Sequence, residues 1–204
     1  RGSVKHYTVW GTPFADWGVD YTGARPGGDP RVIVEPRPDE LGPDNRRPLI
    51  LQRKYTGTAT SVALIKGSEM RLIAAEAELV AGNWSAAIDS INALRTALNA
   101  APPSSWGSRR LTTVSAANAQ EAWEVLMQER GMELWLEGRR LADYRRWANV
   151  PGQNAVPFRR VREPANSPDP EDDPRVSVYQ VDELCLPVSL TEKLANPNIG
   201  VGGN

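Results

Sequence analysis

The apolar residues of this chain repeat with a helical period in two stretches, residues 68–98 and 118–147. In the first stretch Gly82 and Asn83 interrupt the period, which predicts two helices joined by a tight turn. Ser68 is expected to cap the first helix, because its hydroxyl can accept hydrogen bonds from the free amides of the first turn. The apolar residues of that helix form two stripes, Met70, Ile73, Ala74 and Ala77 on one and Leu72, Ala75 and Leu79 on the other. The second helix has one narrow apolar face, which consists of Trp84, Ala87, Ile88, Ile91, Leu94 and Leu98.

The second stretch predicts another helical hairpin. Residues 118–137 are strong helix formers and include no proline. Gly138 is expected to end their helix, since glycine readily adopts the left-handed conformation that closes a helix. Apolar residues occupy two faces of this helix, so it should be enclosed from more than one side. One face carries Trp123, Leu126, Met127, Arg130 and Leu134, and the other carries Val125, Met132 and Leu136.

Charged residues of the second hairpin are ordered as well. Opposite charges stand three or four positions apart, which makes them neighbours on a helix surface. These pairs are Arg130–Glu133, Glu137–Arg140, Arg139–Asp143 and Asp143–Arg146. One interpretation is a solvated helix with weak surface ion pairs. The alternative is a partly buried network, which the three tryptophans of the stretch favour. We expect the buried network, with Arg140 and Asp143 anchoring the turn between the last two helices and serving folding rather than ligand chemistry.

The rest of the chain shows no sustained helical period. Residues 4–10 are compatible with a short strand, whereas the density of glycine, proline and aspartate over residues 11–48 predicts loop. Residues 148–204 also predict loop. The expected fold class is therefore mainly α, one region over residues 1–204 in which a loop-rich segment (1–67) and a loop-rich C-terminal segment (148–204) flank the two hairpins.

Composition narrows the possible partners. The formal net charge of -1 gives no reason to expect nucleic acid or an anionic membrane surface as a partner. Cys185 is the only cysteine and cannot form an internal disulfide. No apolar run approaches the roughly 18 residues that a membrane-spanning helix needs.

The residue chemistry does not favour an enzyme. Glu129, Glu133 and Glu137 follow one another on successive turns of one helix, whereas a glycosidase places two carboxylates on opposite sides of its substrate. His6 is the only histidine, and no serine or cysteine motif lies near it. No phosphate-binding glycine loop and no cysteine–histidine metal spacing is present. The acidic run Asp169, Glu171, Asp172 and Asp173 lacks the spacing of a calcium loop. We therefore expect no catalytic residue, no cofactor and no metal site.

Aromatic residues outside the helices favour a binding function. Their rings could stack on the apolar faces of sugar rings, with polar side chains fixing the hydroxyl groups. The candidates are Trp10, Trp17, Tyr21 and Trp106. The alternative is that each of these rings covers core.

Several motifs resemble those of one family. The run Glu129-Arg130, Glu133-Leu134, Glu137-Gly138, Arg140, Asp143, Arg146-Trp147 resembles the ER..EL..EG.R..D..RW signature of the SusD/RagB family. Four further segments resemble motifs of that family and follow its order. They are Asp29-Pro30-Arg31, Arg53-Lys54-Tyr55, residues 75–95 with Asn92 and Arg95, and the C-terminal stretch from Glu183. The resemblance runs from about residue 29 to residue 204 and is to the C-terminal part of such proteins.

The resemblance implies a function and a place in the cell. SusD/RagB proteins are outer-membrane nutrient-binding lipoproteins with tetratricopeptide-like helical hairpins, so the chain is expected to belong to a longer, lipid-anchored, surface-exposed protein. It would bind an oligosaccharide or a peptide and cap a TonB-dependent transporter of the SusC type, with membrane contact only through a lipid anchor outside this chain. In this family the residues Arg130, Glu133, Glu137, Gly138, Arg140, Asp143 and Arg146, here called the signature residues, would be structural. Two alternatives remain, a helical-repeat scaffold that binds a protein partner and an enzyme whose catalytic residues lie outside this chain.

Overall fold

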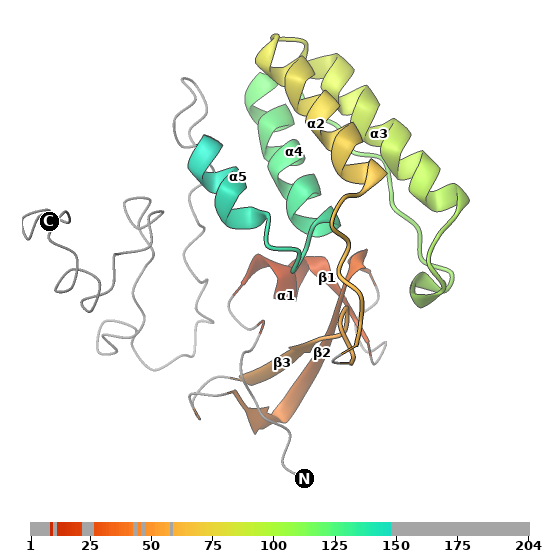
Figure 1. The fold of residues 1–204 in the computed structure, drawn as a ribbon, viewed down its shortest axis with the longest axis vertical. Helices are drawn as coiled ribbons and strands as arrows, with labels where there is room; N and C mark the ends of the chain where they lie inside the picture. Colours follow the sequence, from red (N-terminus) through yellow and green to blue (C-terminus); the bar gives the residue numbers. More distant parts are fainter. Residues whose placement is uncertain are drawn as a thin grey trace, which may run out of the picture.

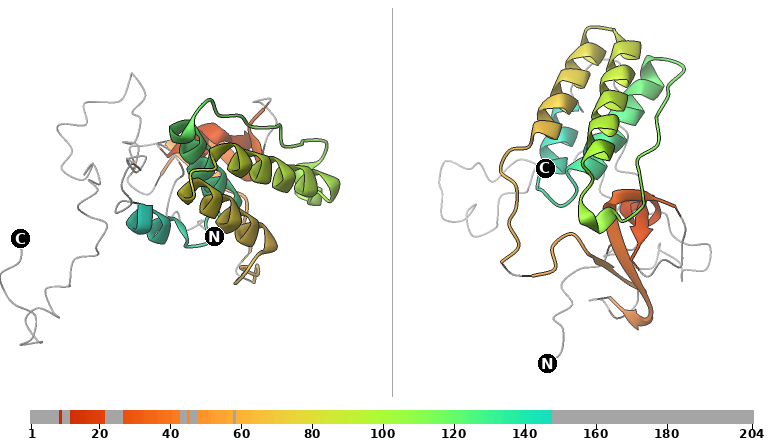
Figure 2. Two further views of the ribbon diagram at one scale, coloured as in Figure 1. Left: turned by 90° about the horizontal axis from the view of Figure 1, so that it is seen from above. Right: turned by 90° about the vertical axis from the view of Figure 1, so that its right-hand side faces the viewer.

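Four helices and a small sheet make up most of the described structure. The computed structural model describes residues 9, 12–21, 27–42, 45, 48–57 and 59–147. Helices α2, α3 and α4 lie side by side at one end of the molecule, with α5 next to α4, while α1 and the sheet lie at the other end (Figure 1). The right-hand view of Figure 2 shows the same two-part arrangement from another side. The C-terminal segment from residue 148 lies outside the described residues, as does the C-terminal motif expected there.

The first hairpin forms as its sequence pattern predicts. Helix α2 spans Gly67–Val80 and α3 spans Trp84–Ala100. Gly82, with φ +83°, lies in the turn between them, where a left-handed backbone conformation favours glycine. The α3 face packs into a core with α2 and α4 that contains Leu72, Ala75, Leu79, Ala87, Ile88, Ile91, Leu94, Ala122, Trp123, Leu126, Met127 and Trp147.

The start of α2 differs from the prediction. Lys66, not Ser68, is the N-cap residue, and the Ser68 hydroxyl instead donates a hydrogen bond to Glu133 Oε1 at 2.7 Å. Of the two predicted apolar stripes, the one with Met70 and Ile73 faces solvent, and these side chains are 48% and 47% exposed. Both stripes are apolar in sequence, and only the position of α4 decides which of them is covered.

Helix α4 spans Ala119–Glu133 and ends four residues before the predicted end. Asn118 caps its start by accepting a hydrogen bond from the Glu121 amide at 3.0 Å. At the other end, Lys66 donates to the Glu133 carbonyl and Lys54 to the Trp135 carbonyl, at 3.0 and 2.5 Å. Lysines from outside the helix thus bind carbonyls that a longer helix would use internally.

A turn of residues 134–138 follows α4 and leads into α5, Arg140–Trp147. Gly138 adopts the predicted left-handed conformation, with φ +75°, but Leu136 does so too, with φ +60°. Leu136 was predicted on a buried helix face and is 45% exposed. The premature end of α4 explains both differences, since Leu136 lies in the turn rather than in the helix.

Residues 11–48 contain a sheet, so the prediction of loop there is wrong. After the short helix α1, Pro13–Trp17, come β1, Gly18–Asp20, β2, Asp29–Leu41, and β3, Pro48–Gln52. The order is β1-β2-β3, with β1 parallel and β3 antiparallel to β2. The expected strand over residues 4–10 falls outside the described residues, except for Val9.

The fold class is therefore mixed rather than mainly α. In β2 the residues Pro30, Val32 and Val34 alternate with partly exposed neighbours and are themselves fully buried. The prolines of this strand conceal its alternation of buried and exposed residues. A strand accepts a proline at positions where no backbone N–H has to donate to the neighbouring strand. The tetratricopeptide-like character of the hairpins remains a prediction.

The sheet is joined to the helices through a second core. Met132 near the end of α4 and Trp135 in the following turn pack against Val32 and Val34 of β2 and against Ala15 of α1.

The linker between α3 and α4 is fixed separately. In it, Val114 and Leu111 exchange paired hydrogen bonds of 2.9 Å with Asn92 and Asn99 of α3.

Candidate functional site

The first carboxylate of the α4 run, Glu129, is completely buried between two arginines from distant parts of the chain. Arg95 of α3 approaches it at 2.5 Å and Arg31 of β2 at 2.7 Å. Arg31 is held in turn by Asp29, at 2.7 Å. Burial lowers the pKa of Arg31, but the hydrogen bonds to Asp29 and the charge of Glu129 outweigh it and raise the pKa above its ordinary value. Arg31 therefore stays charged beside the two carboxylates.

Glu133 and Glu137 are also neutralised by cations from outside α4. Glu133 contacts Lys66 at 2.9 Å and Arg31 at 3.4 Å. Glu137 contacts Lys54 at 2.6 Å and Lys66 at 3.2 Å. The predicted pairs Arg130–Glu133 and Glu137–Arg140 are wrong, because a buried carboxylate binds whichever cations the tertiary fold brings to it.

The pKa values of Lys54 and Lys66 shift in opposite directions at this shared site. Burial lowers the pKa of Lys54, and Glu137 only partly compensates. Burial lowers the pKa of Lys66 too, but the charge of Glu133 outweighs it and raises the pKa. A carboxylate held by such cations is poorly suited to donate a proton as a general acid.

Asp143 connects α5 to α4, as the buried interpretation requires. Its carboxylate is 4% exposed and accepts two hydrogen bonds from Arg130, at 2.9 and 3.0 Å. Arg146 binds the same carboxylate at 2.9 Å, which confirms that predicted pair. Arg146 also forms an ion pair with Glu76 of α2, and the Trp147 indole donates to Glu76 at 2.9 Å. The network thus ties α5 to two other helices.

The remaining signature arginine fills a space that only a glycine leaves open. Arg140 donates to the Met127 carbonyl at 3.1 Å, and its guanidinium lies against Gly131. A Cβ atom at residue 131 would overlap that guanidinium. Arg139, predicted to pair with Asp143, instead forms an ion pair with Glu69 at 3.5 Å.

A separate polar pocket lies at the edge of the sheet. Its volume is about 330 Å³, and we call it the Tyr21 pocket. Tyr21, which follows β1, is 61% exposed, and the Arg53 guanidinium lies 4.7 Å from the centre of its ring. The remaining lining residues are Val19, Asp20, Ile33, Thr56, Ser105 and Arg109. An exposed ring beside hydroxyl, carboxylate and guanidinium groups is an arrangement that can stack on a sugar and bind its hydroxyls.

Comparison with known proteins identifies the family. A family model described as the SusD family matches residues 51–199, which include α2 to α5 and all signature residues. The chain belongs to the SusD family. Its members are nutrient-binding proteins rather than enzymes and are generally associated with the outer membrane. Searches among curated proteins and among solved structures each found no significant match.

Membership of the SusD family does not decide which of the four aromatic candidates could bind a ligand, whereas their exposure in the structure separates them. Trp17 is half-buried and packs edge-on against Phe14, with ring centres 5.6 Å apart. Trp106 is 4% exposed and fits the alternative that these rings cover core. Its burial nevertheless fixes the short helix η1, Ser104–Trp106, which carries Ser105 to the Tyr21 pocket. Trp10 lies outside the described residues. Of the three described candidates, Tyr21 is the one whose ring is presented to solvent.

Sequence reasoning missed the partners of the signature carboxylates. Arg31, Lys54 and Arg95 lie in three of the four further segments that resemble SusD-family motifs, but no role followed from their spacing. Their positions in those motifs were the available signal.

In the described part of the chain, no group of three or more metal-ligating side chains occurs. Among the same residues, no helix combines the length and apolarity needed to cross a bilayer.

Proposed function

We propose that this SusD-family protein is the substrate-binding component of an outer-membrane nutrient uptake complex. In this proposal it binds a glycan at the cell surface, is held there by a lipid anchor, and caps a TonB-dependent transporter of the SusC type. Membership of a nutrient-binding family supports the general role. The glycan and the transporter are the finer parts of the proposal, and each has its own test.

The observation that carries the glycan part is the exposed ring of Tyr21 at a polar pocket. Arg53 lies over the ring, and its ion pair with Glu35 fixes that guanidinium in turn. The neighbouring Asp20 is 5% exposed, so it belongs to a rigid wall rather than to a mobile surface. A rigid aromatic platform with polar groups at its side suits a pyranose ring, which has apolar faces and a polar rim.

The test separates the Tyr21 ring from its hydroxyl. The full-length protein and the variants Tyr21→Ala and Tyr21→Phe are screened on a panel of oligosaccharides, and affinities are then measured by calorimetry. Tyr21→Ala should lower the affinity about fivefold or more, because stacking on an aromatic ring contributes on the order of 1 kcal/mol or more. Tyr21→Phe keeps the ring and should retain most of the affinity. Equal affinities for the native protein and Tyr21→Ala would place the glycan elsewhere.

A specific observation favours protein contact as a second role. The segment before α2 and the outer face of α2 expose several large apolar side chains, which is typical of interaction surfaces. They are Val62, Leu64, Ile65, Met70, Ile73 and Val80. This surface fits the transporter of the proposal and also the alternative of a scaffold that binds another protein.

The two roles are distinguished by a double variant, Leu64→Ser with Ile65→Ser, expressed beside the transporter. Loss of co-purification with unchanged glycan affinity would support a transporter-capping, glycan-binding protein. If the native protein bound no oligosaccharide but bound peptides from a matched panel, the peptide-binding alternative would replace the glycan.

A further inference from the structure

A second pocket lies between α1 and the turn that follows α4, and it shares no lining residue with the Tyr21 pocket. Its volume is about 380 Å³, within the usual range for small-molecule sites. We call it the turn pocket. The residues on which the argument depends are Phe14, Arg130, Trp135, Leu136, Arg139 and Arg140.

The apolar wall of the turn pocket is rigid on one side and strained on the other. The rings of Phe14 and Trp135 lie 5.9 Å apart, and Trp135 is 3% exposed. Leu136 completes the wall with φ +60°, a left-handed conformation that leucine rarely adopts. Strain of this kind persists only where the surroundings hold it, and it is concentrated at functional sites.

The charged wall has more cations than anions. Arg130, Arg139 and Arg140 line the pocket together with one carboxylate, Asp143. Asp143 is already bound by Arg130 and Arg146. Although the side chain of Arg130 is only 4% exposed, its Nη1 has no hydrogen-bond partner among the described residues. A buried donor without an acceptor is costly, so an acceptor placed in the pocket would be stabilising.

From these observations we propose that the turn pocket binds a small molecule with an apolar body and one carboxylate. The aromatic or branched body lies against Phe14, Trp135 and Leu136. The carboxylate lies at the arginine wall, where charge-assisted hydrogen bonds are stronger than neutral ones. Arg139, with a side chain that is 36% exposed, stands at the accessible edge of that wall. This site is independent of glycan binding and of the Tyr21 pocket.

The test uses 3-phenylpropionate as the probe and 3-phenylpropionamide as its neutral counterpart. Both are titrated calorimetrically into the full-length protein. The acid should bind saturably, and the amide should bind about tenfold more weakly, because it lacks the charge. No saturable binding of the acid, or equal affinities for the two compounds, would overturn the proposal.

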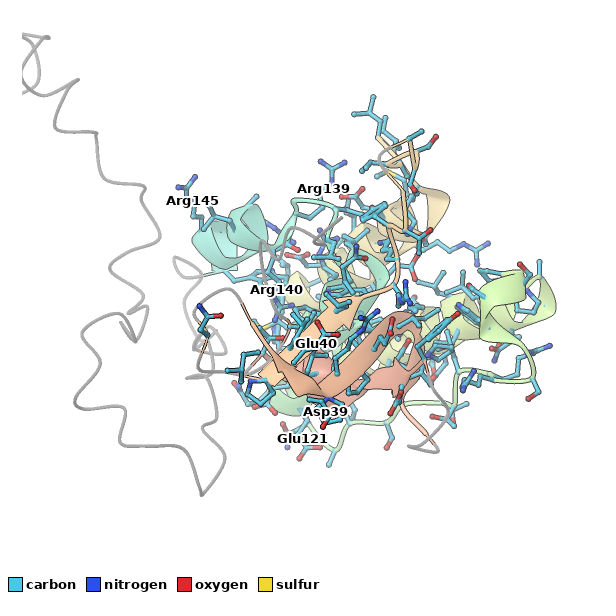
Figure 3. The ribbon with its side chains drawn as sticks, turned by 90° about the horizontal axis from the view of Figure 1, so that it is seen from below. Asp39, Glu40, Glu121, Arg139, Arg140 and Arg145 are labelled. Carbon is cyan, nitrogen blue, oxygen red and sulfur yellow. The ribbon has the colours of Figure 1, made fainter. Side chains whose placement is uncertain are left out.

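Two variants test which wall of the pocket binds the carboxylate and which binds the apolar body. Arg139→Gln should weaken the acid about fivefold and leave the amide unchanged, since it removes one cation and no apolar contact. Leu136→Asn should weaken the binding of both compounds several-fold. Asparagine tolerates the left-handed backbone conformation, but it removes the apolar side chain from the wall. The matched control is Arg145→Gln. Arg145 is an exposed arginine of α5 that points away from the protein in Figure 3 and does not line the pocket.

The controls keep each result interpretable. Thermal unfolding of every variant shows whether it is folded. If Arg139→Gln is not folded, Arg139→Lys keeps the charge and should retain the preference for the acid. An equal loss of acid affinity in Arg145→Gln and Arg139→Gln would show nonspecific attraction to positive charge and would overturn the site.

Discussion

Replacing Asp143 by asparagine tests the central ionic contact of the signature. The substitution keeps the shape of the side chain and removes the charge that Arg130 and Arg146 share. Arg130 is 4% exposed, and its next carboxylate, that of Glu69, is 4.0 Å away. A buried guanidinium would therefore lose its main counter-ion. Breaking a buried pair in this way costs about 3 kcal/mol or more, which lowers the midpoint of thermal unfolding by about 6–12 °C in a protein of 150–250 residues.

The assay is urea and thermal unfolding of the full-length protein, with glycan affinity measured on the same samples. Asp89→Asn, at an exposed position of α3, is the matched control and should change the unfolding free energy by less than about 0.5 kcal/mol. A loss below about 1 kcal/mol for Asp143→Asn would refute the reasoning, because that is the range of solvated pairs. Unchanged stability with lost glycan affinity would move the cluster from the fold to the binding site.

Two further predictions concern the same region. Gly131→Ala should change the unfolding free energy by less than about 1 kcal/mol in urea unfolding, because the added Cβ meets only the end of the Arg140 side chain, and the gain of about 1 kcal/mol in helix propensity offsets the hydrogen bond of Arg140 to the Met127 carbonyl. A loss of more than about 2 kcal/mol would show that the guanidinium cannot move aside. The second uses the raised pKa of Lys66, which burial lowers but Glu133 raises above 10.5. Its stabilising contribution is complete below pH 10.5 and is lost as the pH rises through the pKa of the folded protein. Lys66→Gln should therefore show a smaller decrease in unfolding free energy above pH 10.5 than the native protein, and equal slopes would contradict the shift.

Local patterns predicted the helices but not what covers them. The apolar face of α3 is unambiguous in sequence, because its residues form a single narrow stripe, and the structure buries that stripe. In α2 two stripes compete, and the choice of Leu72, Ala75 and Leu79 depends on where α4 lies. No residue within α2 carries that information.

The ion pairs illustrate the same limit. Helical spacing identifies neighbours on one helix, and it correctly paired Asp143 with Arg146. The counter-ions of Glu129 and Glu137 come instead from Arg31 and Lys54, which are 98 and 83 positions distant. For the candidate ligand site, the position of Tyr21 outside the predicted helices identified it as a candidate. Its neighbours Arg53 and Ser105 could not be predicted, since only the folded chain brings these elements together.

The contacts of Arg31 limit where this chain can be cut into fragments. It lies in β2, ahead of the segment from residue 51 that the family model matches, yet it contacts both Glu129 and Glu133 inside that segment. A fragment that began at residue 51 would retain two buried carboxylates and lose the cation they share. The helical part that the family model matches therefore depends on β2 for one of its buried counter-ions, and a fragment that keeps this contact would have to start before Asp29.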